Sequence, residues 1–287
     1  MVAGAPQLWA AAWQVRTRHH APVIRFDRPL NTLPVSLTGA TCALQCAHCG
    51  GQYLKHMRPI AELDDTTPAT SLLISGGCDR QGRVPVGSNL ARVARLARGR
   101  RLNWHVGQID EPTLSEILPY VDLISYDIVG DAATSREVYG LDLSLADYLR
   151  TYDLLRARVR VVPHITLGLR GGQLSGEAAA LDALVDRGAE AVVFLVLIPT
   201  PGTRYADCPP PDLAKVAGLL LSARTRLPGA RLYLGCMRPR GAYRDALDEL
   251  AVRAGLNVLV NPSRAAVRVA ASLGLTAEWG DECCALD

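Results

Sequence analysis

The sequence has little that would indicate a membrane protein or a nucleic-acid-binding protein. No stretch approaches the ~20 apolar residues of a transmembrane helix, and the short apolar segment around Trp9 and Trp13 is soon followed by Arg16. We therefore expect neither a membrane span nor a signal peptide. The 31 basic residues are scattered, mostly arginine, and nearly balanced by 28 acidic residues. A charge balance this mild argues against a nucleic-acid partner.

The chain also lacks the paired cysteine motifs that are typical of zinc-binding and disulfide-rich proteins. It has eight cysteines without a leader sequence, so we expect a cytoplasmic protein that uses thiols for metal binding or catalysis. They are Cys42, Cys46, Cys49, Cys78, Cys208, Cys236, Cys283 and Cys284.

Apolar runs alternate with helical patterns from residue 33 onward, which predicts repeated β-α units and a parallel sheet. The expected fold is an α/β protein with a closed (β/α)8 TIM-type barrel. A partial (β/α)6 barrel with a C-terminal extension is the alternative. We divide the chain into an N-terminal extension (1–32), the barrel (33–273) and a C-terminal tail (274–287). The eight expected strands are Pro34–Thr38, Ser71–Ser75, Leu102–Val106, Leu123–Tyr126, Val161–Thr166, Ala191–Leu197, Arg231–Leu234 and Asn257–Val260.

The most informative stretch follows the first expected strand. Cys42, Cys46 and Cys49 form a C-x3-C-x2-C motif, and soft thiolate ligands suit iron–sulfur clusters, zinc or Cu(I). Three thiolates on one short loop can hold three irons of a cubane cluster and leave the fourth iron open for a reactant. A structural zinc site with His48 or His56 as a fourth ligand is the alternative, but no second cysteine pair follows it.

This motif resembles that of the radical S-adenosylmethionine (SAM) superfamily. The resemblance implies a radical SAM barrel in which the three cysteines hold a [4Fe–4S] cluster and SAM binds the fourth iron. It further implies a reducing electron donor and a 5′-deoxyadenosyl radical that takes hydrogen from a substrate. No catalytic residue beyond the cluster ligands is predicted.

Polar residues, glycines and cysteines gather where the expected strands end, the face at which such barrels carry their chemistry. Gly76 and Gly77 resemble the glycines of the superfamily's GGE motif, which contact the methionine end of SAM, although Cys78 and Asp79 follow where Glu is usual. A plain tight turn would also explain the glycines. By their positions, Asp127 is predicted to meet the ribose, and His164 and Pro199 to lie near the adenine or methionine part of SAM.

Four further cysteines suggest an auxiliary cluster. Cys78 and Cys236 both follow strands, and the tail carrying Cys283 and Cys284 is able to fold back over the barrel opening. Alternatively, Cys78 and Cys236 are small buried apolar residues, as free cysteines often are. We predict a second [4Fe–4S] cluster on these four residues, with Cys283, Cys284 or both as tail ligands. Cys208, in a proline-rich loop, is left out.

Segments between residues 33 and 284 resemble the archaeal-type, two-protein lipoyl synthases. They include Ser36–Leu54, Ile74–Pro85, Val162–Ile165, Pro199–Thr203 and Gly235–Gly241. The resemblance implies sulfur insertion into an octanoyl chain on a lipoyl carrier domain or H protein-like carrier, with the auxiliary cluster as sulfur source and a paired radical SAM protein as partner. Arg238 and Arg240, next to Cys236, are then candidates for contacts with an acidic carrier. Alternatively, they are ordinary surface arginines, or Arg238 is a neighbour of the auxiliary cluster.

Other functions stay open. The chain lacks the extra N-terminal cysteine motif and the Arg-Ser-Ser-Tyr context of the single-protein lipoyl synthases. A biotin-synthase-like sulfurtransferase or a radical SAM mutase acting on a free small molecule is the alternative enzyme. A non-catalytic metal-binding scaffold is the alternative from another class. The low aromatic content, 5%, weighs against an RNA methylthiolase.

Overall fold

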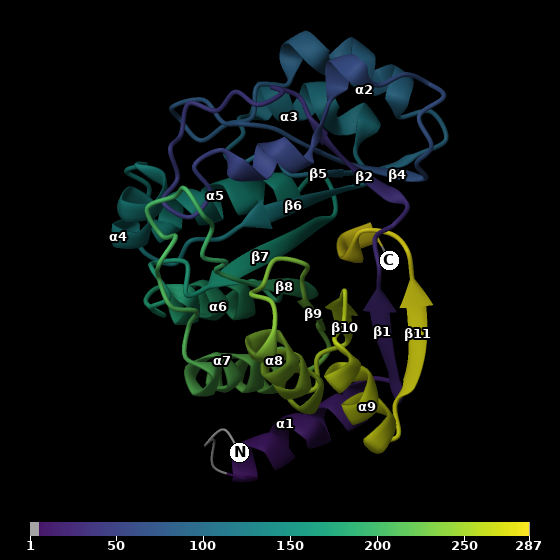
Figure 1. Ribbon diagram of the computed structural model, residues 1–287, viewed down its shortest axis with the longest axis vertical. Coiled ribbons are helices and arrows are strands. Elements are labelled where there is room, and N and C mark those ends of the chain that lie inside the picture. The colour runs from purple at the N-terminus through teal and green to yellow at the C-terminus, as the bar shows by residue number, and fades with distance from the viewer. Residues whose placement is uncertain (1–5, 287) are drawn as a thin grey trace.

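The computed structural model describes residues 6–286, apart from the side chain of Cys284. One parallel sheet of eleven strands, in the order β11-β1-β10-β9-β8-β7-β6-β5-β4-β2-β3, curls around a central lumen, and helices cover its outer face (Figure 1). The strands are β1 (Val23–Asp27), β2 (Thr32–Ser36), β3 (Arg58–Pro59), β4 (Ser71–Ser75), β5 (Arg101–Trp104), β6 (Leu123–Asp127), β7 (Val161–Leu167), β8 (Ala191–Val196), β9 (Arg231–Leu234), β10 (Val258–Val260) and β11 (Thr276–Gly280).

Nine α-helical segments and six shorter helical turns occur in this described part of the chain. The α-helices are α1 (Pro6–His19), α2 (Leu90–Leu96), α3 (Glu111–Ile117), α4 (Ala132–Thr134), α5 (Leu145–Arg156), α6 (Glu177–Asp186), α7 (Leu213–Arg226), α8 (Ala242–Arg253) and α9 (Arg264–Ser272). The turns are η1 (Gln52–His56), η2 (Ile60–Glu62), η3 (Gly87–Asn89), η4 (Leu118–Tyr120), the π-helical η5 (Ser135–Tyr139) and η6 (Cys284–Leu286). None of these helices is long and apolar enough to cross a membrane.

The prediction of a parallel α/β barrel with eight β-α repeats is confirmed, because each expected strand is present as β2, β4, β5, β6, β7, β8, β9 or β10. The sheet differs from a closed barrel in one respect. Its edge strands are β11 and β3, and no hydrogen-bonded ladder joins these two edges within residues 6–286. The sheet is therefore a curled, open barrel rather than a closed cylinder.

Two of the additional strands come from the segments that we assigned to the N-terminal extension and the tail. β1 lies between β10 and β11, in register from Val23 opposite Thr276 to Asp27 opposite Gly280. The chain then leaves β1 and begins β2 at the other end of the sheet. Segments from both ends of the chain are thus part of the sheet, and the open seam lies between the edge made by β11 and β1 and the edge made by β2 and β3 (Figure 1).

The segment after β11 spans this seam. Glu282 accepts hydrogen bonds from Thr32, Thr70 and Ser71, at the starts of β2 and β4. The Asp281 carbonyl accepts a hydrogen bond from the Asn31 amide at 2.9 Å. Side-chain and main-chain hydrogen bonds to the tail therefore join the two edges of the sheet, which a strand ladder joins in a closed barrel.

The tail then enters the lumen. Ala285 and Leu286 are fully buried and pack with the inward-facing residues at the beginnings of the strands, among them Leu123, Val162 and Val193. Contacts of η6 with β5, β6 and β10 agree with this position. The tail thus fills the N-terminal half of the lumen, and the half at the C-terminal strand ends, the mouth, is left for polar residues.

Candidate functional site

The loop that carries the cysteine motif begins after β2 and is fastened to the end of β4 by backbone hydrogen bonds. The Leu37 amide donates to the Ser75 carbonyl at 2.8 Å, and the Ala43 amide donates to the Cys78 carbonyl at 2.7 Å. The Gly77 amide donates to the Thr38 hydroxyl at 2.7 Å. Neighbouring parallel strands therefore bring the first two β-α loops of the repeat together at the mouth.

Gly77 has a packing role in this arrangement. A Cβ atom built on Gly77 would lie 2.0 Å from the Thr41 carbonyl oxygen and 2.6 Å from Cys42 Cβ, so no side chain fits there. A Cβ on Gly76 would meet the Thr38 hydroxyl at 3.1 Å, a tight but milder contact. The close approach of the cysteine loop thus requires a glycine at residue 77, whatever ligand the backbone also contacts.

Four thiols belong to this part of the mouth. The Cys78 amide donates to Cys42 Sγ at 3.3 Å. Burial, followed by the charges of neighbouring thiols, raises the pKa of Cys46 to about 12. Burial and then the charge of Cys42 raise the pKa of Cys78 to about 12. We call Cys42, Cys46, Cys49 and Cys78 the mouth group.

The mouth group fits an iron–sulfur cluster by its donor chemistry. Each thiolate would penalise ionisation of the next, so several are ionised together only beside positive charge, which iron supplies. Within residues 6–286, no three His, Cys, Asp or Glu side chains stand close enough to hold one ion together. The ligands of a cubane cluster bind different irons and therefore stand farther apart.

The outer side of the loop is covered by two segments that are distant in sequence. The Ala47 amide donates to the Val138 carbonyl at 2.7 Å, and the Tyr205 amide donates to the Ala47 carbonyl at 3.0 Å. Val138 lies in η5, and Tyr205 lies between β8 and α7. π-Helical turns are frequent at functional sites, and here one forms a wall of the cysteine loop.

His48 lies between two tyrosines rather than at the surface. Its ring meets Tyr53 at 5.8 Å and Tyr139 at 5.6 Å between centroids, and its Nδ1 is buried without a partner. Burial lowers the pKa of His48 to about 4, so the ring is neutral. His56, the other histidine considered for zinc, is exposed in η1. Tyr53 and Tyr139 were not singled out from the sequence, because neither follows a strand directly.

Asp127, predicted to bind ribose, lies at the end of β6 and pairs with His105. Asp127 Oδ2 and His105 Nε2 are 3.2 Å apart, while Asp127 Oδ1 is buried without a partner. Burial opposes ionisation of Asp127, but the charge and hydrogen bond of His105 outweigh it and lower the pKa to about 2. An ionised carboxylate with an unused buried oxygen is an acceptor for a ligand hydroxyl.

His164 and His105 stack side by side near this carboxylate. Their ring centroids are 6.0 Å apart, and His164 Nδ1 lies 2.9 Å from the Val162 carbonyl oxygen. Burial lowers the pKa of His164 to about 4. We gave no role to His105 from the sequence, although its position just beyond the end of β5 was the available signal.

The remaining predicted SAM contact, Pro199, lies in the loop after β8. The next residue, Thr200, approaches the Tyr53 hydroxyl at 3.3 Å, so this loop closes over η1 at the mouth. The structure therefore gathers Gly77, Asp127 and His164 at one end of the barrel, with Pro199 in a loop at its rim.

The inward-facing residues form two different walls. The wall on β8 to β10 is apolar and includes Val193, Leu195, Tyr233, Val258 and Val260. The wall on β5 to β7 is polar above its first layer and includes Asn103, His105, Ser125, Asp127 and His164. The two walls thus differ in polarity, and the apolar one packs against Ala285 and Leu286 of the tail.

A second pair of cysteines lies on the loop after β9 and on the tail. Cys236 follows β9, and Cys283 precedes η6; we call them the lumen group. Burial and then the charge of Cys283 raise the pKa of Cys236. Asn103 Nδ2 donates to Cys283 Sγ at 3.3 Å, and the Cys283 amide donates to the Thr32 hydroxyl at 2.6 Å. Cys283 is thus held at the lumen by β2 and β5, whereas Cys236 is exposed and is linked to Cys283 through the effect of that thiol's charge on its pKa.

The four cysteines predicted for an auxiliary cluster are thus distributed unequally. The backbone amide of Cys78 is hydrogen-bonded to Cys42 Sγ of the mouth group. The side chain of Cys284 lies outside the described residues. Cys208 lies beside Gly171 and Tyr205 in the loop between β8 and α7, consistent with leaving it out.

The expectation that Arg238 contacts a carrier protein is wrong. Its side chain is fully buried and forms an ion pair with Asp248, with Nε and Oδ1 at 2.7 Å. Arg238 also donates to the Gly235 carbonyl at 2.6 Å and to the Asn261 carbonyl at 3.2 Å. It therefore fixes the backbone next to Cys236, whereas Arg240 is exposed.

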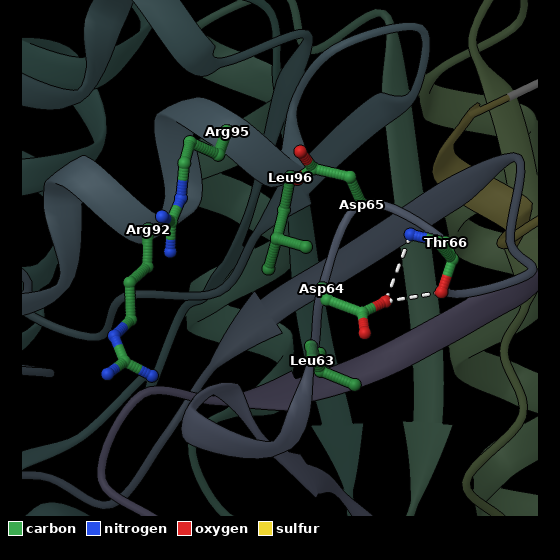
Figure 2. A pocket seen from close by; sticks show the side chains of 7 residues that line it. All are labelled: Leu63, Asp64, Asp65, Thr66, Arg92, Arg95 and Leu96. Atoms are coloured by element: carbon green, nitrogen blue, oxygen red, sulfur yellow. Dashed lines mark hydrogen bonds between the residues drawn. The ribbon is translucent and has the colours of Figure 1, made fainter.

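A cavity of about 260 Å³ lies elsewhere, between α2 and the loop before β4. Figure 2 shows Arg92 and Arg95 projecting from α2 on one side and Asp64 and Asp65 in the loop on the other. The Asp64 carboxylate accepts hydrogen bonds from the backbone and hydroxyl of Thr66. No residue of the mouth group or the lumen group lines this cavity.

Comparison with known proteins identifies the fold. No protein-family model and no curated protein matches the sequence. Among solved structures, methylornithine synthase (PylB) is similar with a TM-score of 0.67 and 13% identity over 95% of this chain and 88% of that protein. HydG, a maturase of the [FeFe]-hydrogenase, has a TM-score of 0.69 and 12% identity over 95% of this chain and 68% of the HydG chain.

Streptococcus suis SuiB bound to S-adenosylmethionine has a TM-score of 0.51 and 13% identity, over 81% of this chain and 58% of that protein. At these identities the likeness concerns the backbone rather than the chemistry. The chain has the curled parallel α/β barrel fold of these three proteins.

Proposed function

We propose that this chain is a radical SAM enzyme in which Cys42, Cys46 and Cys49 hold a [4Fe–4S] cluster. The observation that carries the proposal is the arrangement of three thiols of the mouth group on the loop after β2, which is fastened to the end of β4 at the C-terminal face of the barrel. The chemistry that such a cluster supplies when bound is reductive cleavage of SAM, and hydrogen abstraction from a substrate follows.

The neighbouring residues support SAM as the co-substrate. The backbone at Gly76 and Gly77 ends β4 beside the cysteine loop, where it is able to meet the methionine end. The unpartnered Oδ1 of Asp127 is an acceptor for a ribose hydroxyl. His164 and Pro199 stay our candidates for the adenine side. SuiB, which shares this fold, has been crystallised with S-adenosylmethionine.

We further propose that the enzyme inserts sulfur into an octanoyl chain held by a carrier protein. Two observations support this: the charge of Cys283 raises the pKa of Cys236, which makes the two thiols candidates for part of a second cluster, and the wall beside Cys283 is apolar. The octanoyl carbon would lose hydrogen and gain sulfur while its chain lies against β8 to β10. The polar wall opposite would then hold SAM.

The partners follow from this chemistry. The octanoyl chain is attached to a lipoyl carrier domain or H protein-like carrier, which must dock at the mouth. Of the two arginines first considered for this contact, Arg240 is exposed and remains a candidate. A paired radical SAM protein and a reducing electron donor are further proposed partners.

Iron counting tests both levels of the proposal. Anaerobically reconstituted protein is analysed for iron and sulfide and by Mössbauer spectroscopy, beside the Cys42→Ala/Cys46→Ala/Cys49→Ala variant. We expect about eight irons, falling to about four in the variant, if two cubane clusters are present. About four irons falling to none would leave the SAM cluster but remove the sulfur source. Retention of every iron would contradict the assignment of the mouth group.

Measurements of SAM cleavage and of sulfur insertion distinguish the two proposed cluster sites. Cys236→Ala should keep SAM cleavage and lose sulfur insertion into the octanoylated carrier, with Cys208→Ala as the matched cysteine control. Equal loss of both activities in a folded Cys236→Ala protein would argue against a separate sulfur-donating site. SAM cleavage itself distinguishes the enzyme from a metal-binding scaffold.

A further inference from the structure

The lumen group supplies two described thiols, which is fewer than the three or four ligands that usually hold a cubane cluster. The sequence suggested Cys78 as a further ligand. In the structure the backbone amide of Cys78 donates a hydrogen bond to Cys42 Sγ at 3.3 Å, so Cys78 lies beside the mouth cysteines. A further ligand must therefore come from another side chain that reaches the lumen group.

The contacts of Cys283 lead to β5. Cys283 Sγ accepts a hydrogen bond from Asn103 Nδ2 at 3.3 Å, so Asn103 points into the lumen at the tail. His105 follows two residues later, and alternate residues of an extended segment point to the same face. His105 therefore emerges on the lumen side, one step closer to the mouth.

The hydrogen bond to Asp127 sets the orientation of the His105 ring. His105 Nε2 faces Asp127 Oδ2 at 3.2 Å, so Nε2 carries the proton and donates it to the carboxylate. In the neutral form of the ring, Nδ1 then keeps its lone pair. Metal-binding histidines commonly have this arrangement, with one nitrogen on the metal and the other donating to a carboxylate.

His164 is different, although it stacks on His105 at 6.0 Å. Its Nδ1 is 2.9 Å from the Val162 carbonyl of its own strand, and burial, the largest influence, lowers its pKa to about 4. Asp127 pairs with His105 and not with His164 in hydrogen-bond geometry. The two rings are therefore similar in position and differ in whether a carboxylate orients them.

We infer that His105 is a nitrogen ligand of the second cluster, through Nδ1, together with Cys236 and Cys283. Asp127 orients the imidazole through Oδ2 and is able to hold SAM through Oδ1, so one carboxylate joins the two sites. This inference rests on the second cluster of the proposed function. It assigns to His105 a role that the cysteine pattern did not indicate.

The test uses the full-length Cys42→Ala/Cys46→Ala/Cys49→Ala protein, reconstituted with iron and sulfide and then reduced, so that only the second cluster is observed. Pulsed EPR should detect the strong coupling of a directly bonded nitrogen, larger than that of backbone amides. Labelling with ¹⁵N-histidine should replace the ¹⁴N lines. Adding His105→Ala should remove this coupling, whereas adding His164→Ala should leave it in place.

A rescue variant distinguishes loss of the histidine ligand from loss of the fold. His105→Cys should retain the iron of the second cluster and lose the histidine nitrogen coupling, and circular dichroism should show the wild-type helical content. Four outcomes would overturn the inference: no histidine coupling in the parent, coupling that survives His105→Ala, coupling lost with His164→Ala while His105→Ala keeps it, or no iron in the parent. The last would reject the second cluster itself, whereas the others reject the ligand and leave the cluster.

Discussion

The mouth group and the lumen group are built in different ways. Three of the mouth cysteines come from one short loop, and backbone hydrogen bonds fasten this loop to the end of β4. The lumen cysteines come from the loop after β9 and from the tail, and side chains hold both segments in place. Arg238 and Asp248 fix the first segment, and Glu282 fixes the second.

This difference concerns how each site depends on the rest of the chain. The mouth group needs the neighbouring β2 and β4 to be paired and a glycine where they meet. The lumen group needs the barrel to be complete, because the tail reaches Cys236 only after β11 pairs with β1 and Glu282 spans the seam. We therefore expect substitutions to separate the two sites, with the lumen group the more dependent on distant residues.

The largest effect is expected from Arg238→Met. Removing the guanidinium leaves Asp248 buried and unpaired, which should lower the free energy of unfolding by about 3–5 kcal/mol. Adding Asp248→Leu should recover most of this loss, because buried ion pairs often tolerate apolar replacement. Urea unfolding measures both. If the double variant regains stability but not the iron of the second cluster, the ion pair positions Cys236; full recovery of iron would show that it stabilises the fold alone.

A smaller loss of stability, confined to the mouth, is expected from Gly77→Ala. The added methyl would overlap the Thr41 carbonyl, and overpacking of this kind costs about 1–3 kcal/mol. Iron bound by the mouth group should fall while iron of the lumen group stays. Gly87→Ala is the control, since a Cβ at Gly87 meets nothing within 4 Å. Normal iron content in Gly77→Ala would show that the loop tolerates displacement.

Glu282→Gln tests the seam. The neutral amide keeps one acceptor but weakens the bonds from Thr32, Thr70 and Ser71, so we expect a loss of about 1 kcal/mol. Hydrogen exchange should accelerate in β11 and leave β4 to β8 unchanged. The control is Glu278→Gln, on the exposed strand β11. Uniform acceleration throughout the sheet would contradict a local role for the seam.

The smallest effect, none on the lumen group, is expected from Cys78→Ser. When it is added to the triple variant of the mouth cysteines, about four irons should remain, because Cys78 contacts Cys42 rather than the lumen. Loss of these irons would return Cys78 to the second cluster, as the sequence first suggested, and would remove the distinction between the two groups.

The eight repeat strands were predictable because each is a short apolar run between turn residues and helical patterns. β11 was not, since four of its five residues are exposed and it has no apolar alternation. β1 was assigned to an extension because its partners lie at the far end of the sequence. An edge strand that is defined by distant partners leaves little local signal.

The candidate site likewise has one part that the sequence predicts locally and another part that depends on distant residues. The spacing of Cys42, Cys46 and Cys49 is local, so the sequence was enough to single out this loop. The role of Arg238 was mistaken because an arginine after a strand does not reveal whether an acidic residue from the next helix lies beside it. His105 was visible at a strand end, but its pairing with Asp127 depends on the register of β5 and β6.

The position of the tail also bears on the order in which the molecule assembles. Asn31 and Asp281 are hydrogen-bonded across 250 residues of chain, and contacts so distant form slowly during folding. The cysteine loop and the end of β4, in contrast, lie within about one β-α unit of each other. A nascent chain is therefore able to form the mouth group early, whereas the thiols of the lumen group meet in the final folding step, after the seam has closed.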